Sequence, residues 1–326
     1  MTAKLTATRR FLKPLLVALL FLCLCLALPA LLRSVWQLDF GILRNNSLLL
    51  PALGLQLLAS LLFVQAWKGL TALYPDYRYS FAECAAHIGV TLLGKYLPGK
   101  IWGLLGRSWL LGKRDLPAPR ALNLLLVDQY ITFFTGIMLG AAALLALYQP
   151  VGAVAVLLLG TVGFPVSLLF YDRVIGVVTR LLGRFTNRLS PDAAPDSQVQ
   201  DLRVCIVAFV VYLMHWLATS LVLYLLFNTA FADQQFAGFL VLTAAIPLAM
   251  LAGFVAVWAP GGIGIREGAI VGIIALQFPV ELGVTVALVY RIICVMIDLV
   301  LGGFATVYLT RVAPELISAE HTDRLR

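Results

Sequence analysis

Charged side chains are scarce in this chain, and long polar stretches are scarcer. Of the 326 residues, 12% are charged and 61% are hydrophobic, whereas a soluble domain carries about 25% charged residues. A chain this apolar cannot shield its surface from water, so its solvent must be the lipid bilayer. The composition excludes a soluble globular protein and predicts an all-α, polytopic integral membrane helical bundle.

Residues that bind metals or carry redox chemistry are also few. The five cysteines lie in apolar stretches without a CxxC pair, and the three histidines lie far apart. This pattern predicts no zinc site, no thiol redox site and no cofactor. The net charge of +8 comes without a basic stretch interleaved with aromatic residues, so we expect no nucleic-acid partner and attribute part of the charge to membrane topology.

Long apolar runs mark the expected membrane spans. A helical span needs about 20 residues, and eight segments approach or exceed that length: 14–32, 47–66, 122–147, 151–171, 204–227, 237–257, 263–279 and 284–310. A further apolar segment, 82–112, is interrupted by lysines, a proline and a glycine, and is expected to enter and leave on one face. The sequence therefore predicts about eight spans and one re-entrant hairpin with a broken helix.

Basic residues predict the orientation. Lysines and arginines gather before residue 14, in the loops 67–81, 113–121 and 172–203, and after residue 310. Cytoplasmic loops of membrane proteins are enriched in such residues, which places both termini in the cytoplasm and the chain in the inner (plasma) membrane. If 237–257 crosses the membrane and 263–279 enters and leaves on one face, the C-terminal tail lies outside instead.

One polar segment divides the chain. Residues 172–203 contain a proline- and serine-rich tract typical of a linker. We therefore expect an N-terminal membrane half (1–171), a cytoplasmic linker loop (172–203) and a C-terminal membrane half (204–326).

Each half contains an interrupted helix. Residues 94–107 read GKYLPGKIWGLLGR and residues 258–268 read WAPGGIGIREG, and both contain a Pro-Gly-x-Ile core. Paired interruptions of this kind point to the central site of a transporter, although a match of four residues also arises by chance. Proline and glycine stop a helix, and a helix that restarts at the break aims free N–H groups and partial positive charge at it, which suits an anion.

The charges beside the two breaks extend this hypothesis. The predicted substrate-binding residues are Lys95, Lys100, Arg107, Pro260, Gly261, Gly262, Gly264, Arg266 and Glu267. We expect Arg266 to face the anion, because its guanidinium is a flat fork of donors, and Glu267 to engage a cation such as Lys95 or Lys100. In the alternative interpretation, the three basic residues of the first break only anchor helix ends at the membrane surface.

Three further charged residues lie within apolar runs. Charges at this depth are costly and face a bundle interior, so Asp128, Arg291 and Asp298 are predicted to form an intramembrane polar network. Arg291 and Asp298 are seven residues apart and share a helix face. Internal pairing that holds helices together is an equally good interpretation of these two residues.

The motifs Pro260-Gly-Gly-Ile-Gly-Ile-Arg-Glu-Gly268 and Lys95-Tyr-Leu-Pro-Gly-Lys100 resemble the transmembrane region of the lysylphosphatidylglycerol synthase/flippase family. The resemblance implies a polytopic membrane protein; some members are implicated in flipping aminoacylated phospholipids and others in glycolipid, glycan or hopanoid pathways of the cell envelope. Full-length synthases also carry a soluble aminoacyl-transferase domain. None of the 326 residues is expected to form one, so lysyl transfer is not expected.

Three functions remain open from the sequence. The first is a flippase-like translocator of an anionic lipid or lipid-linked saccharide in the cell envelope. The second is an integral-membrane transferase acting on a lipid-phosphate donor. It ranks lower because such chemistry needs an acidic base or metal ligand near the membrane surface, and the short external loops hold only the isolated acids Asp39 and Asp233. The third is a non-transporting accessory subunit of an envelope-synthesis complex. The expected partners are the membrane and the lipid, together with a second copy of the chain or an envelope-synthesis protein.

Overall fold

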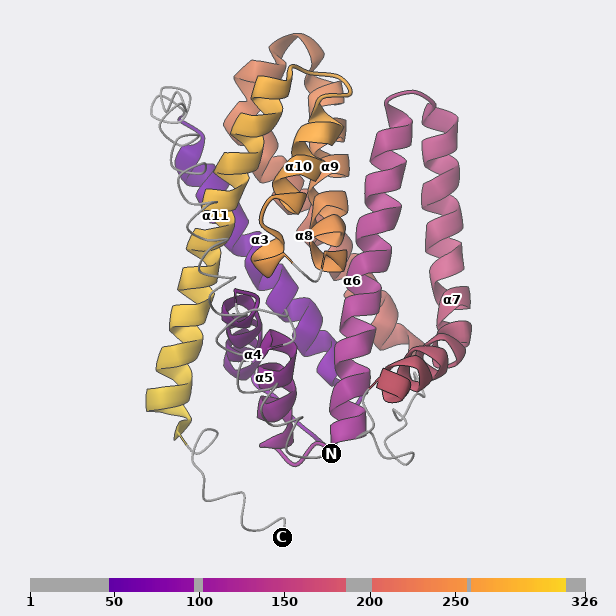
Figure 1. The fold of residues 1–326 in the computed structure, drawn as a ribbon, viewed down its shortest axis with the longest axis vertical. Coiled ribbons are helices and arrows are strands. Elements are labelled where there is room, and N and C mark those ends of the chain that lie inside the picture. Colours follow the sequence, from indigo (N-terminus) through magenta and orange to yellow (C-terminus); the bar gives the residue numbers. More distant parts are fainter. Residues whose placement is uncertain (1–46, 97–101, 186–200, 257–258, 315–326) are drawn as a thin grey trace, which may run out of the picture.

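The computed structural model of the protein describes residues 47–96, 102–185, 201–256 and 259–314. Within these ranges every regular element is a helix and no strand occurs, which confirms the predicted all-α class (Figure 1). The first predicted span, 14–32, lies outside the described residues. The α-helices are α3 (Leu49–Thr71), α4 (Phe81–Gly94), α5 (Trp102–Gly112), α6 (Ala118–Ala146), α7 (Pro150–Phe185), α8 (Leu202–Phe227), α9 (Gln235–Val255), α10 (Ile265–Ile274) and α11 (Val280–Val307).

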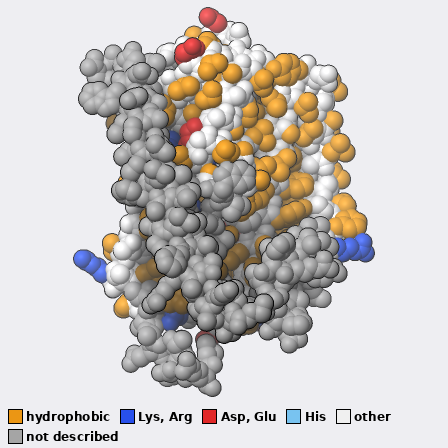
Figure 2. All heavy atoms as spheres, in the orientation of Figure 1, with side chains coloured by type: hydrophobic (Ala, Val, Ile, Leu, Met, Phe, Trp, Pro, Cys, Tyr) orange, Lys and Arg blue, Asp and Glu red, His pale blue; other side chains and the backbone are white. Residues whose placement is uncertain are grey.

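Five segments of the described chain are long and apolar enough to cross a membrane. They are α3, α6, the first part of α7 (Pro150–Tyr171), the segment Leu202–Val255 that contains both α8 and α9, and Val280–Val312, which begins with α11. The aromatic and aliphatic side chains on the visible face form a broad hydrophobic surface, as expected for contact with lipid (Figure 2).

Two helical hairpins approach each other from opposite ends of the bundle. Helices α4 and α5 occupy the lower half in Figure 1, and α10 lies beside α9 in the upper half. Helix α10 has 10 residues, and about 1.5 Å of rise per residue makes it about 15 Å long. That is half of a hydrocarbon core about 30 Å thick.

The helix in the segment 263–279, which was predicted to cross the membrane, is therefore too short to span the hydrocarbon core by itself. Helices α9 and α10 form a second re-entrant hairpin, and α11 begins at the end of the bundle where α8 finishes (Figure 1). The predicted total of about eight spans counted both arms of this hairpin as crossings. Because the hairpin returns to its own side, α11 still ends at the end of the bundle where α8 begins.

The two halves of the chain interleave. Helix α3 packs against α8, α4 against α11 and α6 against α9, so each pair joins one half to the other. Glycines permit the closest of these approaches: a Cβ on Gly89 of α4 would lie 2.3 Å from the carbonyl oxygen of Leu301 in α11. Small residues at helix contacts are typical of membrane bundles. The core that positions the site thus depends on both halves.

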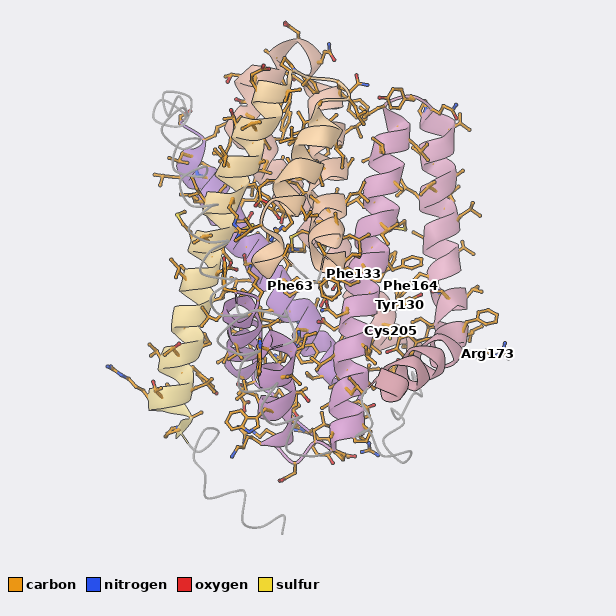
Figure 3. The ribbon with its side chains drawn as sticks, in the orientation of Figure 1. Phe63, Tyr130, Phe133, Phe164, Arg173 and Cys205 are labelled. Carbon is orange, nitrogen blue, oxygen red and sulfur yellow. The ribbon has the colours of Figure 1, made fainter. Side chains whose placement is uncertain are left out.

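Aromatic rings attach α7 to the bundle. The ring of Phe164 in α7 stacks 4.5 Å from that of Phe209 in α8 and lies 5.3 Å from that of Phe134 in α6. Figure 3 shows Phe164 beside Tyr130 of α6, whereas Arg173 points outward at the lower end. Helix α7 continues to Phe185, so the first part of the segment predicted as a linker loop is helical; residues 186–200 lie outside the described residues.

The described basic residues gather at one end of the bundle. The lower end holds the connection between α5 and α6 and the ends of α3, α7 and α11, and acidic side chains appear at the upper end (Figures 1 and 2). The described basic residues of the lower elements are Lys68, Arg78, Lys113, Arg114, Arg120, Arg173, Arg203 and Arg311. The upper end carries Asp233, in a connection, and Glu281, in the first turn of α11, and its connections contain no described lysine or arginine.

Candidate functional site

The two helix breaks touch each other. The backbone N–H of Gly261, in the second break, donates a 3.0 Å hydrogen bond to the carbonyl oxygen of Lys95, which caps α4 at the first break. Gly261, Gly262 and Gly264 have φ of 59°, 72° and 84°, a region that favours glycine because a Cβ is strained there. The glycine-rich motif thus turns the chain sharply where the two hairpins meet.

Helix α11 binds both breaks through two charged residues. Its Asp298 carboxylate lies 2.6 Å from the Lys95 Nζ and accepts a hydrogen bond from the Tyr96 hydroxyl. Its Arg291 donates a 3.2 Å hydrogen bond to the carbonyl oxygen of Gly261 and lies 3.5 Å from the Glu267 carboxylate. Arg291 and Asp298 are two turns apart on one face, so α11 fixes both hairpins at once.

These contacts correct the predicted partner of Glu267. Glu267 pairs with Arg291 rather than with Lys95, whose partner is Asp298. Lys100, the other predicted partner of Glu267, lies outside the described residues. Arg291 and Asp298 each form an ion pair with a residue of a hairpin, whereas Asp128, predicted to share a network with them, pairs with Arg107 instead.

The backbone donors of the second break are largely used within the protein. Gly261 donates to Lys95, Gly262 donates to Ala259 at 3.0 Å, and Gly264 donates to the Glu267 carboxylate at 2.7 Å. Glu267 therefore caps α10 as well as pairing with Arg291. These three glycines therefore have no free N–H group to offer an anion, and recognition of an anion at this point needs other groups, side chains among them.

Arg266 is the side chain best placed for that recognition. It is 6% exposed, and its stem fills the space beside two glycines: a Cβ on Gly253 would lie 2.2 Å from the Arg266 Cγ, and one on Gly262 would lie 2.7 Å from its Cδ. Its guanidinium lies 3.8 Å from the Cys294 sulfur and 5.8 Å from the centre of the Tyr290 ring. No carboxylate among the described residues lies within ion-pair distance of it.

Arg266 opens onto a cavity inside the bundle. The cavity has a volume of about 120 Å³, which is room for several water molecules. Its charged lining residues are Lys95, Arg266 and Asp298, and its uncharged polar lining includes Gln56, Ser60, His215 and Thr219. Residues from both halves of the chain therefore surround one chamber at the junction of the two breaks, and these polar groups are set into a lining that is mostly apolar.

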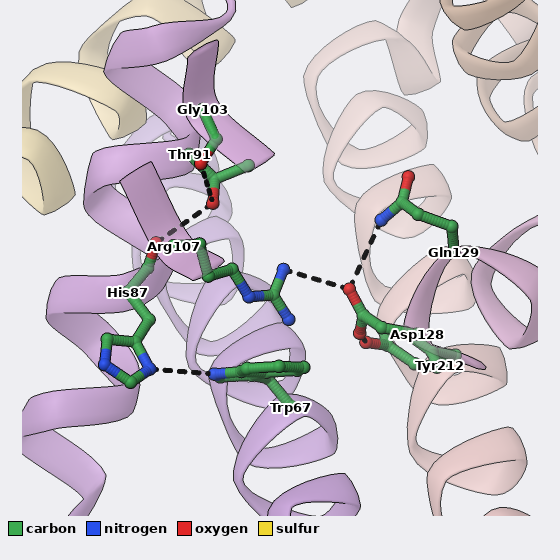
Figure 4. A network of polar contacts seen from close by, with 8 residues as sticks. All are labelled: Trp67, His87, Thr91, Gly103, Arg107, Asp128, Gln129 and Tyr212. Atoms are coloured by element: carbon green, nitrogen blue, oxygen red, sulfur yellow. Dashed lines mark hydrogen bonds and ion pairs between the residues drawn. The ribbon is translucent and has the colours of Figure 1, made fainter. Parts of the chain in front are cut away.

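A second buried network lies apart from this chamber (Figure 4). The Arg107 Nη1 in α5 donates a 3.0 Å bond to the carboxylate of Asp128 in α6, and both side chains are at most 1% exposed. Tyr212 of α8 also donates to Asp128, and the Arg107 guanidinium lies 3.2 Å over the Trp67 ring of α3. Four helices are thus tied together by charge-assisted hydrogen bonds and a cation–π contact.

The predicted site residues fall into distinct places. Lys95 and Arg266 line the cavity, together with Asp298 of the predicted network. Gly261, Gly262, Gly264 and Glu267 build the break, within which Pro260 begins a short 3-10 turn, Pro260–Gly262. Arg107 belongs to the second network with Asp128, so the structure gives it a packing role rather than a place beside Lys95.

Sequence reasoning missed the uncharged side of the chamber. Gln56 and Ser60 come from α3, and His215 and Thr219 come from α8. Their signal in the sequence is a polar pair spaced four residues apart within an apolar run, which places both members on one helix face. Only the packing of α3 against α8 brings the two pairs together.

The fold and site define a class: a helical integral membrane protein whose two helical hairpins meet at a partly open cavity that is lined by charged and apolar residues. Residues 10–302 match the family described as the lysylphosphatidylglycerol synthase TM region, and the chain belongs to that family. The family supports a membrane protein with a lipid-related function. No curated protein and no solved structure matches the chain.

Proposed function

We propose that this protein is a flippase-like translocator that moves a lipid with an anionic headgroup across the inner membrane. The observation that carries the proposal is Arg266, a buried guanidinium on a cavity wall without a described carboxylate partner. A buried charge is costly unless it is paired. An anionic headgroup in the cavity would supply the missing counter-ion.

The arrangement of the hairpins supports movement as well as binding. Discontinuous helices from two halves that meet near the middle of the bilayer are the usual setting of transporter sites. Here the junction is held by a few polar contacts from α11, namely Asp298 with Lys95 and Arg291 with Gly261 and Glu267. A headgroup that competes for Lys95 or Arg266 would loosen this junction and let the hairpins separate.

The carboxylates favour translocation over the transferase alternative. A catalytic base needs a carboxylate that is available to accept a proton. Asp128, Glu267 and Asp298, the described acids of the two buried networks, each form an ion pair with a cation of the protein. Their arrangement suits structural and electrostatic roles better than acid–base chemistry.

We expect the lower end of the bundle, where the described basic residues gather, to face the cytoplasm. A reporter fused after Arg326 should then show a cytoplasmic C-terminus, because α11 ends on that side (Figure 1). A second reporter in the Asn228–Gln234 connection should show the opposite location and serves as the control. A periplasmic reporter after Arg326 would contradict this orientation.

The translocation proposal is tested by reconstitution into vesicles that contain fluorescent phosphatidylglycerol. Addition of dithionite quenches the outer leaflet, and the wild-type protein should expose the inner-leaflet label. Arg266→Gln should slow this exposure about tenfold or more, since a hydrogen bond to a charged group contributes about 1.5–3 kcal/mol. Arg266→Lys should also slow it, because lysine keeps the charge but loses the guanidinium fork.

The matched control is Arg311→Gln, which removes an exposed cation at the end of α11 and should leave the rate unchanged. Wild-type vesicles that expose no more label than protein-free vesicles would overturn the proposal. Equal translocation rates for the wild type, Arg266→Gln and Arg266→Ala would show that Arg266 does not bind the translocated headgroup.

A further inference from the structure

Arg266 carries a buried charge that the described part of the chain does not neutralise. Its side chain is 6% exposed, and its Nη2 lies 3.8 Å from the Cys294 sulfur, a weak acceptor. The other cation that lines the cavity, Lys95, is paired with Asp298 at 2.6 Å. A guanidinium stays protonated inside a protein, and a buried charge is costly unless it is paired. Arg266 therefore needs a counter-ion.

The charges that line the cavity leave one positive charge in excess. Lys95 and Arg266 contribute two positive charges, and the Asp298 carboxylate removes one of them. The neighbouring Arg291 and Glu267, 3.5 Å apart, cancel each other. A single negative charge therefore neutralises the chamber, whereas a divalent anion would leave it negative.

Donors for an anion come from both walls of the cavity. The Arg266 guanidinium has several N–H groups, and the Lys95 ammonium keeps one N–H beyond its contacts of 2.8 Å and 2.6 Å with its carboxylate partner. Gln56, on the wall formed by α3 and α8, adds the N–H groups of its amide. The hydroxyl protons of Ser60 and Thr219 are donated to carbonyls of their own helices, so these two hydroxyl groups do not compete for the anion.

The apolar lining decides which monovalent anions fit. Beside these few donors the cavity is lined mostly by aliphatic and aromatic side chains, such as Phe63, Trp216 and Leu301. An ion in this setting recovers only part of its hydration, and removal from water costs most for small or multiply charged ions. The volume of about 120 Å³ exceeds the ~10–15 Å³ that one water molecule needs, so a halide fits with water beside it.

We propose that the chamber binds one weakly hydrated monovalent inorganic anion, of which chloride is the commonest, as the counter-ion of Arg266. The inference concerns the same chamber as the proposed function, but it holds whether or not the protein moves a lipid. Chloride and a lipid headgroup share one chemistry, a negative charge that pairs with the guanidinium. The test therefore has an arm for each source.

The test measures the binding of radiolabelled chloride to the full chain by equilibrium dialysis. The protein is held in a neutral detergent after its copurified phospholipid has been removed, with bulky gluconate keeping the ionic strength constant. One chloride should be retained per chain. Bromide should displace it at least as well as unlabelled chloride, whereas fluoride and sulfate should need about a tenfold or larger excess, because their dehydration costs more. In the second arm, retention of phosphatidylglycerol by a protein that retains no chloride would overturn the inference.

Variants place the anion at Arg266. Arg266→Gln should lose the retained chloride, and Arg311→Gln, which removes an exposed cation, should keep it. Asp298→Asn raises the excess charge of the chamber by one and should tighten chloride binding about tenfold, a gain that misfolding cannot produce.

Full retention in Arg266→Gln, unchanged affinity in Asp298→Asn, or displacement by fluoride as effective as displacement by bromide would overturn the inference. Chloride binding without lipid translocation would overturn the proposed function alone, and translocation by a protein that binds no chloride would overturn this inference alone.

Discussion

Replacing Asp128 with asparagine is expected to lower the free energy of unfolding by about 3–5 kcal/mol, the range found when one partner of a buried ion pair is removed. The Arg107 guanidinium and the Asp128 carboxylate are at most 1% exposed and 3.0 Å apart. Without the carboxylate, the guanidinium keeps its charge but loses its acidic partner, and the Tyr212 hydroxyl loses an anionic acceptor. Thermal unfolding in detergent and abundance in the membrane measure the loss.

The double variant Arg107→Met/Asp128→Leu is the control for this prediction. Replacing both partners by apolar residues removes the buried charge, so it should restore much of the stability lost in Asp128→Asn. The cycle formed by the single and double variants isolates the energy of the pair. Asp128→Asn with wild-type stability, or a double variant less stable than both single variants, would contradict the packing role that the structure gives to Arg107.

Replacing Asp298 with asparagine is expected to have a large effect on lipid retention and on the translocation rate. The substitution raises the excess positive charge of the chamber by one and frees Lys95 from its carboxylate. Anionic lipid should therefore be retained more tightly, and translocation should slow about tenfold, because a ligand that binds the resting state more strongly leaves less readily. The measurements are the lipid that copurifies with the protein and the translocation rate in vesicles.

We expect Asp298→Asn to lower the free energy of unfolding less than Asp128→Asn does. The Lys95 side chain is 24% exposed and lines a cavity that admits water, so its charge can be solvated when the carboxylate is removed. Asp233→Asn changes an exposed acid at the upper end and should alter neither measurement. Unchanged lipid retention together with an unchanged rate in Asp298→Asn would show that Asp298 does not compete with the ligand.

The sequence predicts the membrane fold well and the second hairpin poorly. A run of apolar residues indicates how long a helix is and that it faces lipid, but not whether it crosses the membrane. Helix α9, with 21 residues, is as long as a crossing helix. Only the neighbouring α10, with 10 residues, reveals that the two helices are arms of one hairpin. The glycine-rich motif marks the break itself, because left-handed backbone at Gly261, Gly262 and Gly264 leaves a compositional trace.

The site could be predicted only where charge lies beside a break. Lys95 and Arg266 stand next to proline–glycine motifs and were identified, whereas Gln56 and His215 belong to short polar pairs within apolar runs. Their convergence depends on the packing of α3 against α8, helices that are far apart in the chain. The partner of Glu267 was predicted wrongly for the same reason, because Arg291 reaches it from α11.

The most direct test of the central account is to map where the headgroup of a bound lipid lies. Phosphatidylglycerol with a photoreactive group on its headgroup would be crosslinked to the protein in vesicles, and the labelled peptides would be identified by mass spectrometry. The account predicts labels on the cavity wall, at Gln56, Ser60 and Met250, and their loss in Arg266→Gln. Labels confined to outward residues of α7 such as Leu159 and Leu169, unchanged in Arg266→Gln, would contradict it.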